Sequence, residues 1–240
     1  MNGLEIYQNV YTPEQCNQLI KLFGDDDRKQ SGKILSPDGM KEDPSIKTST
    51  DLQLNFLNPD DQVYKDIILQ PLAERVGLFI EKYAFLSVCD RWDISGEYNI
   101  QRYNEGEGFF KPHCEQGANN PYRMLAWMVY LTDSISGTEF PYQNTIVEAR
   151  KGNLAIWSAG WTHPHKGQTP NVGLKYIITG WGHFHNQTDY ELSQAPTQGA
   201  FLCYYINVER FPTSLTNARI YGCLCSAEKL RPVSLIEADT

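Results

Sequence analysis

The sequence predicts an α+β protein that is mainly β, in which helices come first and a sheet core follows. Residues 12–24 read as a capped amphipathic helix, and residues 60–83 carry a second helical apolar pattern. From Tyr98 onward, runs rich in Tyr, Ile, Val and Trp alternate with Gly and Pro, as in short strands joined by turns. A double-stranded β-helix, the jelly-roll type of closed double sheet, with helices supporting one face fits this order.

The first helix has clear sequence signals at both ends. Thr12 can cap the helix, Pro13 suits its first turn, and Gln15 completes a capping box. The pattern stops at Gly24. The apolar stripe expected to face the core is formed by Cys16, Leu19, Ile20 and Phe23.

The segment between the two helices is expected to be a loop followed by a strand. Residues 25–46 are polar and interrupted by Pro and Gly, so they fit either a mobile loop covering a substrate or a solvated connection. A strand is expected over Lys47–Leu54. The helix at 60–83 should be kinked or divided at Pro71. Its expected inward residues are Val63, Ile67, Leu72, Val76, Phe79, Ile80 and Tyr83.

His113 and Glu115 form the most informative motif of the chain. On a strand, two side chains separated by one residue point to the same face, so an imidazole and a carboxylate can converge on one metal ion while Cys114 turns away. A third ligand must come from elsewhere, and the segment 161–167 offers His163 and His165. Two imidazoles and one carboxylate favour a non-haem Fe(II) oxygenase site.

The surroundings of these residues resemble the prolyl 4-hydroxylase-like 2-oxoglutarate/Fe(II) dioxygenases. The stretch Arg102–His113 is similar to that family's approach to the first ligand. The following stretches match in the family's order: Arg123–Asp133 as a core strand, Gly137–Pro141 as a turn, Lys151–Trp157 before the distal histidine, and Gly173–Trp181 at the co-substrate anchor.

The likeness covers residues 97–184, which we expect to be the dioxygenase core of a single domain spanning 1–240. Residues 1–96 would then supply helical support and a loop region. Residues 185–240 would be a C-terminal extension of undecided role, with a further strand at Ala200–Val208.

The resemblance also implies a set of ligands and a co-substrate site. The family's distal histidine stands two residues before a glycine and ten before a basic residue, which selects His165 with Gly167 and Lys175 over His163. Metal ligands are thus His113, Glu115 and His165, with Glu115 standing where the family usually has aspartate. His163 is expected to form hydrogen bonds nearby, and His183 and His185 to lie at a strand end or on the surface. The co-substrate 2-oxoglutarate would be bound by Lys175, Tyr103, Thr179 and Tyr130, with Trp181 packed beneath the metal.

The chemistry implied by this likeness needs Fe(II), 2-oxoglutarate and O2, with ascorbate as an additional candidate cofactor, and no catalytic residue beyond the metal centre. Oxidative decarboxylation of 2-oxoglutarate to succinate and CO2 would be coupled to hydroxylation of an unactivated C–H bond. A peptidyl proline is the favoured substrate, in an aromatic-lined groove. Its candidate residues are Tyr98, Phe109, Phe110, Tyr122, Trp127 and Trp161.

Three alternatives remain at this point. They are a hydroxylase of a free amino acid or small metabolite, a non-catalytic jelly-roll module that binds metal, and a cupin-like enzyme that needs no oxo acid. Lys175 argues against the last, since such an enzyme needs no buried cation at that place.

Composition limits the partners. A formal net charge of −8 argues against a protein that binds nucleic acid through phosphate contacts. No stretch has the length and hydrophobicity of a membrane span or the pattern of a secretory signal, so we expect a soluble cytoplasmic protein.

Six scattered cysteines indicate neither a disulfide framework nor a zinc ribbon, and the pair Cys223–Cys225 fits a strand. The oligomeric state is left open.

Overall fold

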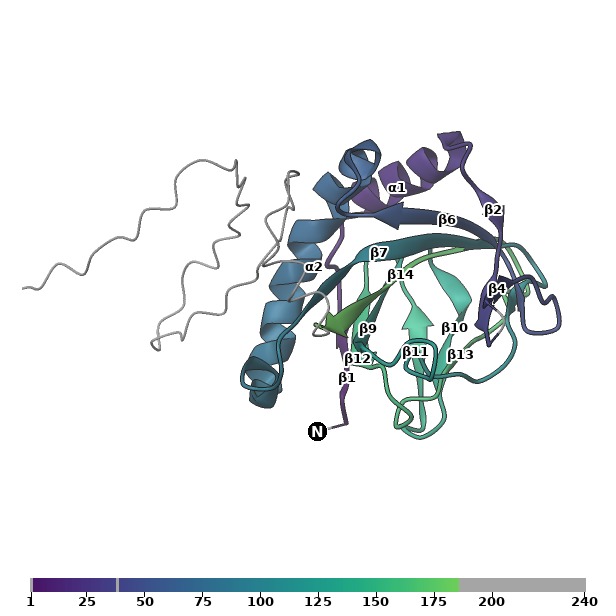
Figure 1. Cartoon of the computed structure of the whole chain (residues 1–240). Helices are drawn as coiled ribbons and strands as arrows, with labels where there is room; N and C mark the ends of the chain where they lie inside the picture. The colour runs from purple at the N-terminus through teal and green to yellow at the C-terminus, as the bar shows by residue number, and fades with distance from the viewer. Residues whose placement is uncertain (1, 38, 186–240) are drawn as a thin grey trace, which may run out of the picture.

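A seven-stranded antiparallel sheet faces a three-stranded one, and two helices cover the outer face of the larger sheet (Figure 1). The computed structural model describes residues 2–37 and 39–185. Strand order is β1-β12-β9-β14-β7-β6-β2 in the large sheet and β11-β10-β13 in the small one. The expected double-sheet core behind N-terminal helices is confirmed.

The elements occur in an order that places both long helices before most of the sheet. The helices are α1 Pro13–Asp25, η1 Pro59–Asp61, α2 Gln62–Lys82 and η2 Ala84–Ser87. The strands are β1 Leu4–Tyr7, β2 Gln30–Ser31, β3 Ile34–Ser36, β4 Gly39–Lys41, β5 Lys47–Thr48, β6 Thr50–Asn55, β7 Trp92–Tyr103, β8 Gly108–Phe109, β9 Arg123–Tyr130, β10 Ser134–Phe140, β11 Thr145–Ala149, β12 Leu154–Ser158, β13 Lys166–Gly167 and β14 Lys175–Phe184.

The first helix forms as its sequence predicts. The Thr12 side chain accepts a hydrogen bond from Gln15 N, and the Gln15 side chain accepts one from Thr12 N, which is the reciprocal capping box. Cys16, Leu19 and Phe23 are fully buried. The helix extends one residue past Gly24, to Asp25.

The second helix differs from expectation in two respects. It runs unbroken through Pro71, although proline removes one bond of the helical ladder. The carbonyl that loses its helical donor is that of Ile67, whereas the neighbouring Ile68 is fully buried and its carbonyl accepts a hydrogen bond of 2.9 Å from the Tyr11 hydroxyl. Val63 is 43% exposed rather than inward, because Tyr64, Ile68 and Leu72, at four-residue spacing, define the buried face.

Strands in the middle of the large sheet are apolar on both faces, because each face packs against a different layer. In β9, Trp127 and Val129 belong to the core beneath the helices, whereas Met128 and Tyr130 belong to the core between the two sheets. Trp127 fits only because its neighbour across the strand pair is Gly180. A Cβ there would lie 2.2 Å from Trp127 Cζ2.

Residues 25–46 are not the featureless loop that their polarity predicted. They contain β2, paired to β6, and the hairpin β3–β4, which forms a separate two-stranded sheet. The predicted strand Lys47–Leu54 is divided at Ser49 into β5, which pairs with β8, and β6, which joins the large sheet. The predicted turn at Gly137–Pro141 is also wrong, since Gly137 lies within β10. The chain turns instead at residues 141–144, where Asn144 has a positive φ of 50°.

Several expectations concern residues outside the described part of the chain. The extension beyond His185, the strand at Ala200–Val208 and the pair Cys223–Cys225 all lie there. Within the described residues, Cys16, Cys89 and Cys114 are free thiols. No helix in residues 2–37 or 39–185 has the length and apolar character needed to span a membrane.

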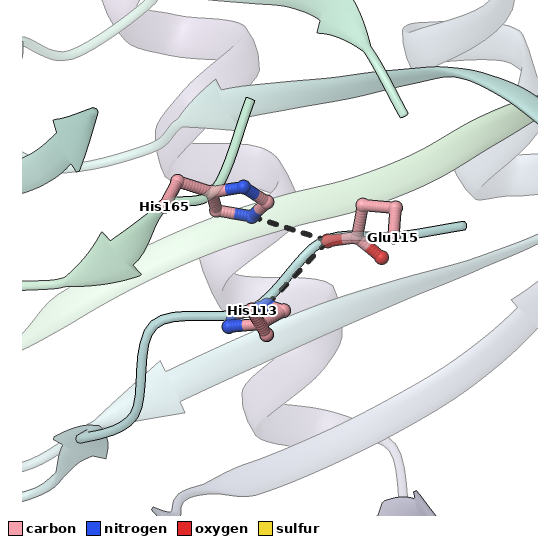
Figure 2. A group of neighbouring side chains, drawn as sticks. All are labelled: His113, Glu115 and His165. Carbon is pink, nitrogen blue, oxygen red and sulfur yellow. Dashed lines mark ion pairs between the residues drawn. The ribbon is translucent and has the colours of Figure 1, made fainter. Parts of the chain in front are cut away.

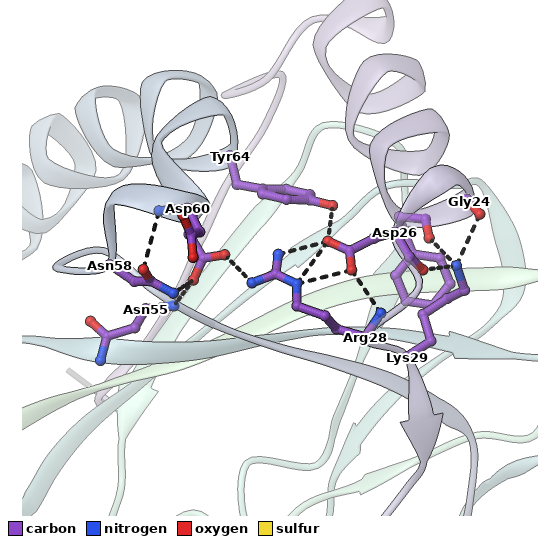
Figure 3. Close-up of polar contacts among 10 residues, drawn as sticks. Gly24, Asp26, Arg28, Lys29, Asn55, Asn58, Asp60 and Tyr64 are labelled. Carbon is purple, nitrogen blue, oxygen red and sulfur yellow. Dashed lines mark hydrogen bonds and ion pairs between the residues drawn. The ribbon is translucent and has the colours of Figure 1, made fainter.

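A partly buried ionic network joins the end of α1 to the start of α2 (Figure 3). Arg28 donates to Asp26 Oδ2 and to Asp61 Oδ1, both at 2.7 Å. Asp61 is 1% exposed, and its other oxygen accepts Asn55 N at 2.8 Å. The Tyr64 hydroxyl completes the network by donating to Asp26 at 3.1 Å. These contacts fix the helices against the edge of the sheet that carries β6.

Replacing Arg28 by alanine should lower the free energy of unfolding by about 2 kcal/mol, because the buried Asp61 carboxylate would lose a charged donor. Urea unfolding at neutral pH measures the loss. Arg150→Ala is the control: Arg150 and Glu148 form an ion pair in which both side chains are more than half exposed, so its loss should change stability by no more than about 0.5 kcal/mol. Equal losses in the two variants would contradict this interpretation.

The same network predicts a dependence on pH. The hydrogen bond from Arg28 lowers the pKa of Asp26 from its usual 3.8 to about 2. A carboxyl with a depressed native pKa stabilises the fold at pH above its unfolded pKa and loses that contribution as the pH falls towards 2. Wild type should therefore lose more stability than Arg28→Ala between pH 4 and pH 2, as followed by circular dichroism.

Candidate functional site

His113, Glu115 and His165 meet at the inner side of the double sheet. Figure 2 shows the three side chains pointing toward one another from two segments of the chain. Their candidate ligand atoms all lie within 4.8 Å of one another. Glu115 Oε1 is 3.3 Å from His165 Nε2 and 3.6 Å from His113 Nε2. Two imidazole nitrogens and a carboxylate oxygen are a donor set that fits Fe(II).

Backbone hydrogen bonds bring the two histidines together. His113 and Glu115 lie in an extended segment between β8 and β9 rather than on a regular strand, so the predicted strand context is wrong. The segment forms a single antiparallel bridge in which His113 N donates to His165 O at 3.0 Å, and His165 N donates to His113 O at 2.9 Å. The bridge preserves the alternation that aims both ends of the His-x-Glu motif to one side. Cys114 lines the cavity but is not part of the cluster.

Both imidazoles are oriented by backbone carbonyls. His113 Nδ1 lies 3.1 Å from Lys111 O, and His165 Nδ1 lies 3.0 Å from His163 O. A carbonyl oxygen only accepts, so Nδ1 is the donor in each ring, and Nε2 is the nitrogen that faces Glu115 and would bind a metal. The rings are also packed. Phe109 stacks on His113 with centroids 3.8 Å apart, and Trp157 meets His165 edge-on at 5.0 Å.

The Glu115 carboxylate has different neighbours at its two oxygens. Oε1 faces the histidines, whereas Oε2 accepts Trp181 Nε1 at 2.8 Å and Arg123 NH1 at 3.2 Å. Trp181 was expected to pack beneath the metal, and it does lie against the cluster. Burial by itself raises the pKa of the Glu115 carboxyl, but hydrogen bonds and charge from His113 and His165 outweigh it and hold that pKa well below its usual range. Glu115 is therefore ionised at neutral pH.

The remaining histidines lie outside the cluster. The His163 side chain is 5% exposed and turns to the N-terminal segment, where Nε2 lies 2.7 Å from Asn2 O. Its link to the site is the backbone carbonyl that orients His165, not its ring. His183 lies near the end of β14, and His185 follows that strand and pairs with Asp93.

The cluster opens into a cavity of about 590 Å³. Strands β14 and β7 form one wall, and alternate residues of each face the cavity because side chains alternate along a strand. These residues are Lys175, Ile177, Thr179 and Trp181 from β14, and Glu97, Asn99, Gln101 and Tyr103 from β7. The hairpin β3–β4 lines the mouth with Ile34, Leu35 and Met40.

Lys175 places a buried ammonium in this cavity. The residue is 3% exposed, and its Nζ donates to Gly137 O of the small sheet at 2.9 Å. Burial lowers the pKa of Lys175 to about 8. Among the described residues no carboxylate forms an ion pair with it, so the charge is available to an anion in the cavity.

The expected hydroxyl contributors occupy different places. Tyr103 and Thr179 line the cavity with Lys175, and Tyr103 pairs with Lys175 across the β7–β14 ladder. The Tyr103 hydroxyl donates to Gln101 Oε1 at 2.8 Å. Tyr130 is fully buried outside the cavity lining and donates to Thr138 Oγ1 at 2.8 Å, so it reaches the cavity only through Thr138.

The expected aromatic groove is not formed as a unit. Of the six aromatic candidates only Phe109 lines the cavity. Tyr98 and Trp127 are buried on the helix side of the sheet because of their position in the strand alternation. Phe110, Tyr122 and Trp161 are exposed outside the cavity lining.

The sequence interpretation missed several polar residues of the cavity. Lys47 and Asp51 form a buried ion pair in its wall, and Gln101 and Arg123 also line it. Arg123 had one usable signal, a lone charge at the start of the apolar run 124–131. The others come from strands whose pairing the sequence did not specify.

The sequence model of the 2OG-Fe(II) oxygenase superfamily matches residues 98–183, which contain all three residues of the cluster and Lys175. Residues 98–183 are a 2OG-Fe(II) oxygenase domain. The oxygenase domain implies Fe(II), 2-oxoglutarate and O2 as cofactor and co-substrates, and the chain is a 2-oxoglutarate-dependent dioxygenase. No curated protein sequence matches the chain.

Solved structures share the fold at low sequence identity. A prolyl hydroxylase from Trichoplax adhaerens in complex with a hypoxia inducible factor peptide fragment is 14% identical, with a TM-score of 0.56 over 80% of this chain and 88% of that chain. The viral collagen prolyl hydroxylase from Paramecium Bursaria Chlorella virus-1, in a 2OG complex, is 17% identical, with a TM-score of 0.55 over 76% of this chain and 97% of that chain. A Pseudomonas putida prolyl-4-hydroxylase is 15% identical, with a TM-score of 0.53 over 78% and 95%. The oxygenase domain therefore has a prolyl 4-hydroxylase-like fold.

Proposed function

We propose that this dioxygenase hydroxylates an extended peptide, with a peptidyl proline as the favoured target, and couples this to decarboxylation of 2-oxoglutarate to succinate and CO2. The observation that carries the proposal is one cavity that contains both the His113–Glu115–His165 cluster and the buried ammonium of Lys175.

His113, Glu115 and His165 would hold Fe(II), which supplies the oxygen chemistry when bound. The protein's part is to orient the two imidazole ligands and to pack aromatic side chains against them. The Nδ1 contacts to backbone carbonyls would fix each imidazole with Nε2 toward the ion. Trp157 packs on the buried His165 ring, and Phe109 covers one face of the His113 ring.

Lys175 would bind the distal carboxylate of 2-oxoglutarate. One of its three N–H donors is used by Gly137 O, and the others are free to bind a carboxylate in a dry site. Thr179 and Tyr103 face the same cavity and would add hydroxyl contacts. Tyr130 would act on this subsite through Thr138, to which it donates.

An extended peptide suits the polar side of the cavity. Gln53, Asn99 and Gln101 offer carboxamides, which donate and accept hydrogen bonds as peptide groups do. Leu35 and Met40 of the β3–β4 hairpin line the same cavity, are 41% and 62% exposed, and would cover apolar parts of a bound chain. The structural likeness to a prolyl hydroxylase holding a peptide supports this choice.

The ligand assignment predicts a difference between two histidines. In anaerobic protein supplied with Fe(II) and then 2-oxoglutarate, wild type should develop the visible metal-to-ligand charge-transfer band. His165→Ala should abolish the band. His163→Ala should leave it largely intact, because the backbone carbonyl that orients His165 remains. The reverse pattern would overturn the assignment, and a wild type without any band would leave a non-catalytic jelly-roll module as the better description.

Lys175→Ala should raise the 2-oxoglutarate concentration needed for the band by about 10- to 100-fold, because a buried charged hydrogen bond is lost. Metal affinity, measured without 2-oxoglutarate, should change little. A parallel loss of both affinities would point to misfolding instead.

The binding of 2-oxoglutarate should also depend on pH through Lys175. The ammonium is protonated below its pKa of about 8, so affinity should be highest below that pH and should fall as the pH rises through it. Lys175→Arg keeps its charge over this range and should flatten the profile. An unchanged profile in Lys175→Arg would assign the pH dependence to another group.

Substrate class is tested by succinate release. Proline-containing peptides should raise the rate well above the level without substrate, whereas free proline and other amino acids should not. Stimulation by free amino acids alone would favour the metabolite hydroxylase.

A further inference from the structure

Glu115 is held by residues that do not belong to the cluster itself. Its outer oxygen, Oε2, accepts hydrogen bonds from Trp181 Nε1 at 2.8 Å and Arg123 NH1 at 3.2 Å, while Oε1 alone faces the two histidines. An indole N–H and a guanidinium N–H can only donate, so neither nitrogen can serve as a metal ligand. The carboxylate is thus divided between a metal side and a protein side.

Arg123 reaches this position because of an irregularity in β9. Between β14 and β9 the register is Gly182↔Leu125 and then His183↔Arg123, so Met124 is an extra residue without a partner on β14. In regular alternation Arg123 would share the helix side with Leu125. The bulge turns Met124 toward the helix-side core and leaves Arg123 facing the cavity.

Trp181 and Arg123 also fix each other. The guanidinium carbon of Arg123 lies 3.6 Å from the centroid of the Trp181 ring. Trp181 is itself held in β14, opposite Ala126 of β9. Two donors from adjacent strands therefore form a rigid unit, which we call the Arg123–Trp181 clamp.

The reach of this clamp matches a glutamate. An aspartate carboxylate at position 115 would lie one C–C bond, roughly 1.5 Å, closer to the backbone. With hydrogen bonds of 2.8 and 3.2 Å on one oxygen and histidine nitrogens at 3.3 and 3.6 Å from the other, such a shift breaks contact on one side or the other.

We propose that Arg123 and Trp181 are positioning residues that hold Oε2 of Glu115, so that the carboxylate offers the metal only Oε1, and that the length of the clamp is what makes glutamate the right acid in this chain. This inference rests on the proposed function of the cluster as the metal site. It assigns the departure from His-x-Asp to a specific pair of neighbours. Since a carboxylate held at one oxygen cannot chelate with both, the clamp also preserves the open positions that a 2-oxo acid needs.

The test uses Co(II) as a spectroscopic substitute for Fe(II), titrated into the whole chain without oxygen. Trp181→Phe removes only the indole donor and keeps an aromatic ring beside Arg123. It should weaken Co(II) binding about 10-fold and change the visible Co(II) spectrum, because outer partners of metal ligands typically contribute 10- to 100-fold in affinity. Arg123→Gln should act in the same direction and serves as the second variant if Trp181→Phe folds poorly.

Trp127→Phe is the matched control. It makes the same chemical change on the neighbouring strand, but Trp127 Nε1 has no hydrogen-bond partner and the ring packs in the helix-side core. Its Co(II) affinity and spectrum should equal those of wild type. Thermal unfolding of each variant checks that the fold is retained.

A double-mutant cycle isolates the clamp. Glu115→Asp should weaken Co(II) binding by itself, and adding Trp181→Phe to Glu115→Asp should cost less than 2-fold further, because the aspartate no longer uses the clamp. Two results would overturn the clamp but not the metal site. One is that Trp181→Phe weakens Co(II) binding by the same factor in wild type and in Glu115→Asp. The other is that Trp181→Phe and Trp127→Phe have the same Co(II) affinity and spectrum. A wild type that binds no Co(II) would overturn the proposed function, and the clamp with it.

Discussion

The reciprocal backbone hydrogen bonds between His113 and His165 are the constraint on which the site depends. They join two segments that the sequence separates by the whole of β9 to β12. Because the bridge is made by main-chain atoms, it sets the distance between the backbones of the two histidines. Each ring then needs only one carbonyl at Nδ1 to aim its Nε2 inward, and Lys111 and His163 supply those carbonyls. The segment holding Glu115 is fixed by the same bridge.

The two layers of apolar packing give the cavity its chemistry. Helices α1 and α2 cover one face of the large sheet (Figure 1). Alternate residues of β7, β9 and β14 therefore pack in the core between the sheet and the helices. The other residues face the small sheet, where part of the space is filled and part is left as the cavity. Along β14 the alternation carries Lys175, Thr179 and Trp181 to one side, from the buried ammonium of Lys175 to the cluster. A single strand thus carries residues of both the proposed anion subsite and the proposed metal site.

Local irregularities refine what this regular framework provides. The bulge at Met124 changes the side of Arg123, and Gly180 makes room for the Trp127 ring beneath the strand that carries Trp181. The bulge places Arg123 against Glu115, which stands where the resembled dioxygenases usually have aspartate. In the proposed clamp, the length of Glu115 matches the positions of the donors Arg123 and Trp181. Changing only the acid or only the donors would misplace the carboxylate.

The sequence by itself determined the fold class, the first helix and the membership of the cluster. Thr12, Pro13 and Gln15 act on their own neighbours, and the spacing of His165 to Gly167 and Lys175 is a property of the chain alone. Prediction from the sequence failed where the conformation or orientation of a residue depends on a partner far away in the chain. Pro71 lies inside its helix without dividing it, and Gly137 lies in a strand because β11 and β13 pair with β10. The sides taken by Tyr98, Trp127 and Arg123, and the holding of Glu115 at one oxygen, were decided only by tertiary structure, because strand register and bulges are set by pairing between segments far apart in the chain.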